Sequence, residues 1–221
     1  MNSNIEIAEL SFLDCENFFT EEFSGRFFAL LPEEDTDGDI LHKCGRLLLR
    51  YMAIKSGVMS REDALKAKIE IGENGKPYFT DGDTDFSISH SGRLVGCALM
   101  RGGKVGFDLQ ERKIDAQKAK KLALRFFSEK EQAICESSGD YEKMFHMIWT
   151  KKEALIKYHG ICFENSEISD TTKLPSELCM FSAFMSQEKE SYAFSLCCKS
   201  GIGVAQPRFV MPGDILATLG S

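Results

Sequence analysis

The sequence predicts an α+β fold made of two similar halves. In each half, segments with helical spacing of apolar residues come first, and segments of alternating residues follow them. The chain has 221 residues, 43% of them hydrophobic, which is enough for one large domain or two small ones. We therefore expect an N-terminal half over residues 1–103 and a C-terminal half over residues 104–221. Each half is expected to be a small antiparallel sheet packed on helices, although no clear sequence repeat is visible.

The first half opens with a loosely alternating stretch, residues 4–13, which predicts a strand. Phenylalanines at helical spacing follow, and we expect them to pack in a core: Phe18, Phe19, Phe23, Phe27 and Phe28. The clearest helix spans Ile40–Ser56 and stops at Gly57. A short helix over 61–67 comes next. Alternation and turn residues then predict strands at 69–71, 78–79, 86–89 and 94–100.

The second half opens with a predicted strand at 105–109, joined to the preceding strand by a hairpin across Arg101–Lys104. A basic helix over 114–125 follows, and Ser128 with Glu131 forms a capping box for the next helix. A long helix from about 140 to 159 ends before Gly160. The remainder predicts a hairpin of 178–185 with 191–198, and weak strands at 208–210 and 214–218.

Composition excludes several classes of function. The net charge of −7 argues against a nucleic-acid binder, which is normally basic. Eight scattered cysteines show no Cys-x-x-Cys pair and no zinc spacing, so we expect reduced thiols in a cytoplasmic protein. No signal peptide opens the chain, and no apolar run approaches the roughly 20 residues of a membrane span.

Two acidic residues in different settings suggest chemistry. Trp149, Glu153 and Lys157 are four apart, so they share one side of the long helix. Asp108 lies late in a strand, where Asp is disfavoured and needs a partner. Each has a simpler explanation. Glu153 and Lys157 could form an ordinary exposed pair, and Asp108 could pair with a neighbouring base or cap a turn.

A second set of polar residues is cationic or donates hydrogen bonds. On the Ile40–Ser56 helix, Lys43, Arg46 and Arg50 form a row that is either a solvated face or a phosphate contact. Lys76, Ser89 and His90 lie at a turn and a strand end. Mg²⁺ is held by only one or two protein carboxylates and by substrate phosphates. Asp108 and Glu153 with these cations therefore indicate a Mg²⁺-dependent enzyme acting on a polyphosphate. No Walker-A loop or Rossmann glycine fingerprint is present.

Ordered motifs over residues 75–157 resemble those of the 4'-phosphopantetheinyl transferases. Val105-Gly106-Phe107-Asp108 resembles the Gly-Ile/Val-Asp motif of that family. The stretch from Trp149 to Lys157 resembles its Trp-(Ser/Thr)-x-Lys-Glu-Ala-x-x-Lys motif. Gly75-Lys76-Pro77, the segment 86–91 and the segment 125–131 also agree. The length is similar to the larger monomeric type that activates surfactin and other peptide synthetases, a pseudo-dimer of two α+β halves with the active site between them.

The resemblance implies transfer of phosphopantetheine from coenzyme A to a serine of an acyl or peptidyl carrier protein, with release of 3',5'-adenosine bisphosphate. It implies that Asp108 and Glu153 bind Mg²⁺, with Glu153 also the serine's base, and that Lys157 contacts the diphosphate. Glu131 is a further candidate ligand or base. Coenzyme A would be bound by Lys76, Pro77, Ser89 and His90, with the 3'-phosphate near Lys43, Arg46 or Arg50.

One residue departs from the family's pattern. Many members have Glu where this chain has Gln110, and an amide is a weaker Mg²⁺ ligand than a carboxylate, so we expect an altered metal preference rather than lost activity. The alternative functions are a coenzyme A-binding homologue without catalysis and a Mg²⁺-dependent phosphohydrolase. We expect the basic helix to dock the acidic carrier protein, and the protein to act as a monomer without nucleic-acid or membrane partners.

Overall fold

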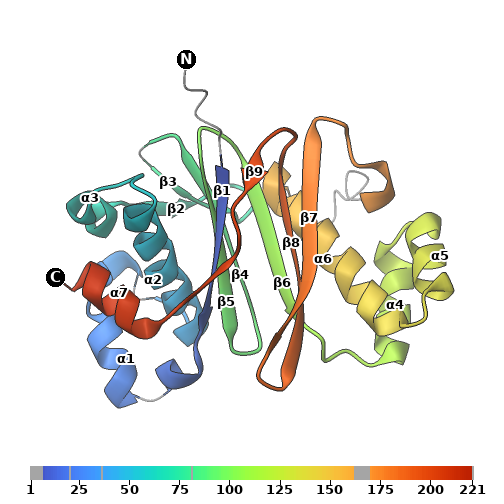
Figure 1. Cartoon of the computed structure of the whole chain (residues 1–221), viewed down its shortest axis with the longest axis horizontal. Helices are drawn as coiled ribbons and strands as arrows, with labels where there is room; N and C mark the ends of the chain where they lie inside the picture. Colours follow the sequence, from blue (N-terminus) through green and yellow to red (C-terminus); the bar gives the residue numbers. More distant parts are fainter. Residues whose placement is uncertain (1–6, 20, 36, 81, 162–169, 221) are drawn as a thin grey trace.

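Helices cover both ends of the molecule and strands fill its centre (Figure 1). The computed structural model describes residues 7–19, 21–35, 37–80, 82–161 and 170–220. The predicted α+β class is confirmed. The helices at one end are α1 (Glu21–Phe28), α2 (Ile40–Lys55), α3 (Arg61–Lys66) and α7 (Pro212–Leu219). Those at the other end are α4 (Ala116–Phe126), α5 (Glu129–Ser137) and α6 (Tyr141–His159).

The first sheet is antiparallel at its centre and gains parallel strands from the end of the chain. Its strands lie in the order β10-β1-β5-β4. Their bounds are β1 (Ile7–Asp14), β4 (Thr84–Ser91), β5 (Leu94–Arg101) and β10 (Arg208–Val210). β9 (Gly203–Val204) also pairs with β1, and both β9 and β10 run parallel to it. Strand β1, expected at residues 4–13, is confirmed over the part that the structure describes.

The second sheet consists of β6 (Val105–Glu111), β8 (Glu190–Lys199) and β7 (Leu178–Gln187), in that order and antiparallel throughout. Its β7–β8 hairpin was predicted from the sequence. A separate small hairpin pairs β2 (Ile69–Ile71) with β3 (Pro77–Phe79). Short 3₁₀ helices lie at Glu16–Phe19, Glu33–Asp35 and Thr171–Lys173.

Two predicted elements were wrong. The hairpin expected across Arg101–Lys104 does not form, because β5 pairs with β1 and β4 while β6 pairs with β8. The connection instead takes the chain from one sheet to the other. Residues 214–218 form a helix rather than a strand. Pro212 suits a first helical turn, Asp214 accepts a hydrogen bond from Met211 N at 3.3 Å, and Ile215 and Leu219 lie buried one turn apart.

The two sheets pack face to face around an apolar core. Phe12 of β1 meets Phe194 of β8 at 5.2 Å between ring centroids and Phe107 of β6 at 6.0 Å. Gly96 on β5 makes room for this packing, because a Cβ there would lie 2.6 Å from the Phe107 ring. Outside the sheets, Phe18 and Phe27 are buried with α2, whereas the side chains of Phe19 and Phe23 lie outside the described part. The order of layers is therefore helix, sheet, sheet, helix.

Side chains of β4 seal the open edge of β6, and we call this contact the β4–β6 seam. Asp85 Oδ2 accepts a hydrogen bond from Val105 N at 2.9 Å, and Ser87 Oγ accepts one from Phe107 N at 3.0 Å. Ser91 Oγ accepts one from Glu111 N at 2.9 Å. The alternating polar residues of β4 thus satisfy backbone groups of an edge strand that would otherwise be unpaired.

Gly106 allows β6 to lie directly against α6. A Cβ at this position would lie 2.0 Å from the Ala154 carbonyl oxygen and 2.3 Å from the Tyr158 nitrogen, both of which are helix backbone. Neither atom can move without disturbing α6. The glycine therefore brings β6 close enough to α6 for Asp108 to meet the side chains of that helix.

The last segment of the chain returns to the first half, where β9 and β10 extend the sheet at β1 and α7 packs near α2. The division at residues 103 and 104 as two domains remains a prediction. The described cysteines are free, and most are buried, whereas Cys162 lies outside the described residues. None of the described helices combines the length and the apolar character needed to cross a bilayer.

We predict that Gly106→Ala destabilises the protein by about 1–3 kcal/mol or more, because the added methyl group overlaps the α6 backbone. Urea unfolding measures the change. Gly139→Ala is the matched control, since a Cβ at Gly139 meets nothing within 4 Å, and its effect should stay within about 0.5 kcal/mol. Equal stability of the two variants would contradict the proposed contact.

Candidate active site

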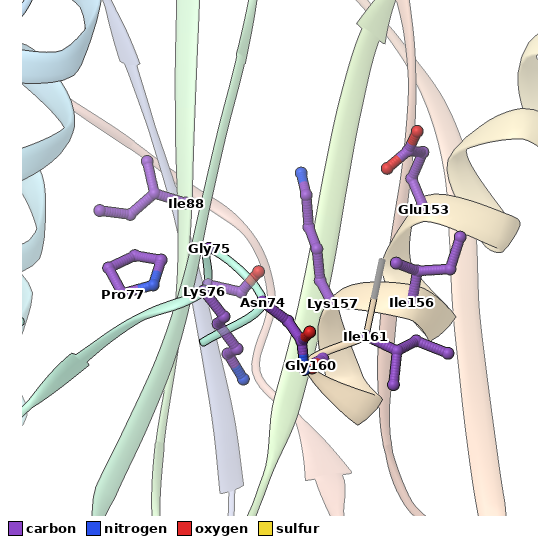
Figure 2. A pocket seen from close by; sticks show the side chains of 11 residues that line it. Asn74, Gly75, Lys76, Pro77, Ile88, Glu153, Ile156, Lys157, Gly160 and Ile161 are labelled. Carbon is purple, nitrogen blue, oxygen red and sulfur yellow. Dashed lines mark hydrogen bonds between the residues drawn. The ribbon is translucent and has the colours of Figure 1, made fainter. Parts of the chain in front are cut away.

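A cavity of about 440 Å³ lies between the turn that joins β2 to β3 and the C-terminal part of α6 (Figure 2). The first half contributes residues of the turn and of β4, and the second half contributes one side of α6. The residues that line it are Asn74, Gly75, Lys76, Pro77, Ser87, Ile88, Glu153, Ile156, Lys157, Gly160 and Ile161. The cavity therefore lies between segments from before and after residue 103, the boundary expected from the sequence.

Helix α6 presents Glu153 and Lys157 to this cavity. The helix is capped by Asp140, whose side chain accepts a hydrogen bond from Lys143 N, and it ends at Gly160 in the left-handed conformation, φ 64°. Figure 2 shows the charged ends of Glu153 and Lys157 pointing the same way. Trp149, one turn earlier, stacks on Phe145 at 5.6 Å, so its ring belongs mainly to the packing of α6 against α4 and α5.

Three of the predicted residues donate hydrogen bonds to the carboxylate of Asp108, a residue that is only 2% exposed. Its Oδ1 accepts hydrogen bonds from Lys157 Nζ at 2.8 Å and Ser89 Oγ at 2.7 Å. The amide of Gln110 donates to Oδ2 at 3.3 Å. These partners come from α6, β4 and β6, so Asp108 occupies the point where the two halves converge.

Glu153 is the acid of the site whose protonation is most perturbed. Burial, together with the negative charge of Asp108, raises the pKa of Glu153 to about 7, and Lys157 opposes that rise. Within the described chain, no donor is hydrogen-bonded to this carboxylate. Its charge is therefore poorly balanced, and it can exchange a proton near neutral pH.

Lys76 and Pro77 lie on the opposite wall. Lys76 Nζ donates to Asp85 Oδ2 at 2.6 Å and to the Val105 carbonyl at 2.9 Å. Figure 2 shows this side chain pointing away from the end of Lys157. Lys76 thus anchors the turn to both halves while Pro77 lines the cavity. Asp85, which sequence reasoning missed, forms an ion pair with this predicted residue.

His90 lies beside a second histidine that no sequence motif singled out. The rings of His90 and His42 are 4.9 Å apart, and His42 Nδ1 is 2.9 Å from Asp39 Oδ1. Burial and the charge of His42 lower the pKa of His90, and the carboxylate of Asp39 opposes that shift. A local signal for His42 was present in the sequence. Asp39 can cap a helix, and His42 is the third residue after it, which is the position that an N-cap side chain contacts.

Two predicted site residues turn toward Asp35. Arg50 is 1% exposed, and its guanidinium donates to Asp35 and to the carbonyls of Ala64 and Ala67. Arg46 Nε lies 3.9 Å from Asp35 Oδ1, and its buried Nη1 has no hydrogen-bond partner in the described part of the chain. Arg50 therefore has a structural role, and its position does not support contact with a phosphate. Lys43 on the same helix lies over the ring of Phe28 at 5.4 Å.

Glu131 also has a structural role. It is fully buried, and its Oε2 accepts hydrogen bonds from Lys152 Nζ at 2.9 Å and Ser128 N at 2.8 Å. Its Oε1 accepts hydrogen bonds from the backbone and the hydroxyl of Thr171, both at 2.8 Å. The capping box predicted for Ser128 and Glu131 is confirmed. A carboxylate with this many donors is poorly placed to act as a base or metal ligand.

Asp108 and Glu153 form an acidic pair whose chemistry can be compared with that of a divalent-cation site. In the described part of the chain, no three His, Cys, Asp or Glu side chains converge as a metal-binding group. Asp108 and Glu153 supply two carboxylates near enough for the charge of one to raise the pKa of the other. Mg²⁺ needs only one or two such ligands. The chemistry of this donor set is therefore compatible with Mg²⁺.

Comparison with known proteins identifies the relatives of this chain. A family model described as the 4'-phosphopantetheinyl transferase superfamily matches residues 104–197. A Haemophilus influenzae protein whose name proposes a 4'-phosphopantetheinyl transferase is 30% identical over 171 residues, which cover 72% of this chain and 70% of that protein. The 4'-phosphopantetheinyl transferase Sfp of Bacillus subtilis is 32% identical over 155 residues, 64% of this chain and 65% of Sfp.

The 4'-phosphopantetheinyl transferase gsp of Aneurinibacillus migulanus is 36% identical over 119 residues, covering 52% of this chain and 46% of gsp. The matched part of the chain thus spans less than two thirds of the length of Sfp and of gsp. The superfamily match includes Asp108, Glu153 and Lys157, whereas the turn with Lys76 and Pro77 precedes it.

We predict that Glu153→Gln stabilises the ligand-free protein at neutral pH. The pKa of Glu153 is raised in the folded state, so the stability that this group contributes is complete below pH 4.5 and is lost as the pH rises through about 7. The amide that replaces the carboxylate does not ionise. The variant should therefore gain roughly 1–3 kcal/mol over the wild type between those pH values.

Urea unfolding at a series of pH values measures this difference. Glu73→Gln, at an exposed residue of the turn, is the control and should show no such trend. A constant difference between Glu153→Gln and the wild type across this range would show that Glu153 is not held in the environment described.

Proposed function

This chain belongs to the 4'-phosphopantetheinyl transferase family, and we propose that it transfers 4'-phosphopantetheine from coenzyme A to a carrier protein. The acceptor is a serine hydroxyl of an acyl or peptidyl carrier protein, and the second product is 3',5'-adenosine bisphosphate. The single observation that supports this best is that Glu153 and Lys157 line the cavity while Lys157 is hydrogen-bonded to the buried Asp108 behind it.

Coenzyme A is proposed to bind with its nucleotide in the cavity beside Pro77 and its diphosphate beside Lys157. Both residues line that cavity. The 3'-phosphate is assigned to the region of His90 and His42 at the start of α2, where the two imidazole rings lie 4.9 Å apart, with Lys43 next to His42 in the chain. Arg50 is left out of the set because its guanidinium is already bonded.

Asp108, Glu153 and the amide oxygen of Gln110 are proposed to hold the Mg²⁺ ion. When bound, the ion would neutralise charge on the diphosphate and on the leaving bisphosphate. Lys157 now donates to Asp108, and it would shift its hydrogen bonds toward the diphosphate as the ion takes over that carboxylate. Gln110 supplies a neutral ligand, so the site has one charge fewer than it would with a third carboxylate.

The reaction proceeds by attack of the serine oxygen on the phosphorus that bears the pantetheine arm. A new oxygen–phosphorus bond forms, and the bond from that phosphorus to the bridging oxygen breaks with its electron pair on the bisphosphate. Glu153 is proposed to accept the serine proton, because its carboxylate lines the cavity beside Lys157 and has no hydrogen-bond donor within the described chain. Lys157 stabilises the negative charge that develops on the departing phosphate.

Within this proposal the protein acts as a monomer, since one chain supplies both walls of the cavity. The cysteines that the structure describes are free, which fits the reducing cytoplasm. The basic surface of α4, formed by Lys118, Lys120, Lys121 and Arg125, is the proposed docking site for an acidic carrier. Exposed Leu124 lies on the same helix and adds an apolar contact.

The function is tested by incubating the protein with coenzyme A, Mg²⁺ and a panel of unmodified carrier proteins. Intact mass should show that one carrier gains a single phosphopantetheine. Lys157→Met should lower kcat/KM by about 10²–10³-fold, because it removes a charge that stabilises the leaving group. Lys66→Met, at an exposed lysine paired with Glu62, is the matched control and should retain full activity.

Two outcomes would refute the transferase. Release of adenosine bisphosphate without any carrier would indicate a phosphohydrolase. Binding of coenzyme A with no transfer to any carrier would indicate a homologue that binds without catalysis.

We predict that Lys120→Glu combined with Lys121→Glu raises KM for the carrier protein by about tenfold, since two of the four positive charges of the docking surface are reversed. The affinity for coenzyme A should not change, because α4 residues do not line the cavity. Steady-state kinetics with each substrate varied in turn separates the two effects. Reversal of Lys55 and Lys66, which lie on the helices of the other half, is the control.

A further inference from the structure

The turn between β2 and β3 belongs to a small hairpin that is separate from both large sheets. Gly72 N donates to the Lys76 carbonyl at 2.9 Å and Gly75 N donates to the Gly72 carbonyl at 2.9 Å, so residues 72–76 form a tight loop. Gly75 has φ 83°, which suits glycine. Among the described strands, β2 and β3 pair only with each other. The turn therefore depends on side-chain contacts for its position against the rest of the protein.

Asn74 supplies such a contact across the boundary between the halves. Its Nδ2 donates a hydrogen bond to the Gly160 carbonyl at 2.7 Å, although the two residues are 86 positions apart. Figure 2 shows Asn74 reaching the end of α6 at Gly160. Gly160 is in the left-handed conformation that ends the helix, so its carbonyl no longer takes part in the helical pattern.

The chemistry at this point favours a neutral amide. The C-terminal end of a helix has a partial negative charge, which attracts a hydrogen-bond donor and repels a carboxylate. Asn74 is a donor of the right length, and Asp at the same position would place a negative charge beside that carbonyl. The contact is exposed, so its net contribution is modest, about a factor of ten or less in an equilibrium.

The hydrogen bond joins the two walls of the candidate site. Gly75, Lys76 and Pro77 follow Asn74 and line the cavity, whereas Glu153 and Lys157 line it within two turns before Gly160. Lys76 is the second tie of the turn to the C-terminal half, through the Val105 carbonyl at 2.9 Å. Removing this hydrogen bond would weaken the hold of the C-terminal half on the tip of the turn, while the Lys76 contact remains.

We propose that Asn74 is a positioning residue for coenzyme A, an inference that rests on the function proposed above. Its amide fixes the tip of turn 72–76 against the end of α6. It thereby sets the separation between the nucleotide wall at Lys76-Pro77 and the reacting groups at Glu153 and Lys157. It acts before coenzyme A arrives, by holding the cavity in the shape that binds.

The test uses Asn74→Ala and Asn74→Asp, with Glu73→Ala in the same turn as the matched control. Hydrogen exchange of the ligand-free proteins should show faster exchange at the amides of Gly72 and Gly75 in both Asn74 variants and no change in the control. Calorimetry with coenzyme A and steady-state kinetics follow. KM and Kd for coenzyme A should rise about 3- to 10-fold, more for Asp than for Ala, while kcat and KM for the carrier stay within about twofold.

The outcomes separate this inference from its premise. Weaker coenzyme A binding without faster exchange would mean that Asn74 contacts the ligand directly, and would overturn the positioning role. Faster exchange with unchanged KM and Kd for coenzyme A would overturn it as well. If the wild-type protein neither binds coenzyme A nor modifies a carrier, the proposed function fails instead, whatever the exchange experiment shows.

Discussion

The close approach of β6 to α6 at Gly106 sets the geometry on which the candidate site depends. Because glycine has no Cβ, the strand lies against the helix backbone at Ala154 and Tyr158. Two residues along the same face, Asp108 comes within 2.8 Å of Lys157, and Glu153 lies one turn earlier on the helix. The carboxylates are therefore held near each other although their charges repel, which is the cause of the raised pKa of Glu153 after burial itself.

The β4–β6 seam gives this arrangement its second wall. Its hydroxyls and Asp85 replace the strand partner that β6 lacks on its outer edge, so the two sheets join without backbone pairing between them. Asp85 then has a double role, since it also holds Lys76 and with it the turn beside Pro77. Stability of the boundary and shape of the cavity thus depend on the same side chains.

Much of the secondary structure could be predicted because its signals are local. Helix α6 was predicted from good helix-forming residues and Gly160, and its spacing put Glu153 and Lys157 on one side. Strand pairing was less accessible. The β5–β6 hairpin was expected because a glycine-containing connection joins two apolar strands, yet β6 pairs with β8, some 85 residues later. The structural roles of Arg50 and Glu131 could not be predicted for the same reason. Arg50 bonds to Asp35, and Glu131 bonds to Lys152 and Thr171, all of which come from other elements.

The sequence by itself determined the α+β class, the periods of most elements, the Ser128–Glu131 capping box, and the motifs that place an Asp on a strand and a Glu and Lys on a helix. These features depend on residues a few positions apart, whose conformations are biased before any distant contact forms. Only the tertiary structure decided which polar groups face the cavity and which are used up in packing. In the folded protein, Asp108 pairs with Lys157, the buried Glu131 pairs with Lys152, and Asn74 bonds to Gly160. Burial and long-range hydrogen bonds arise only when the layers have assembled.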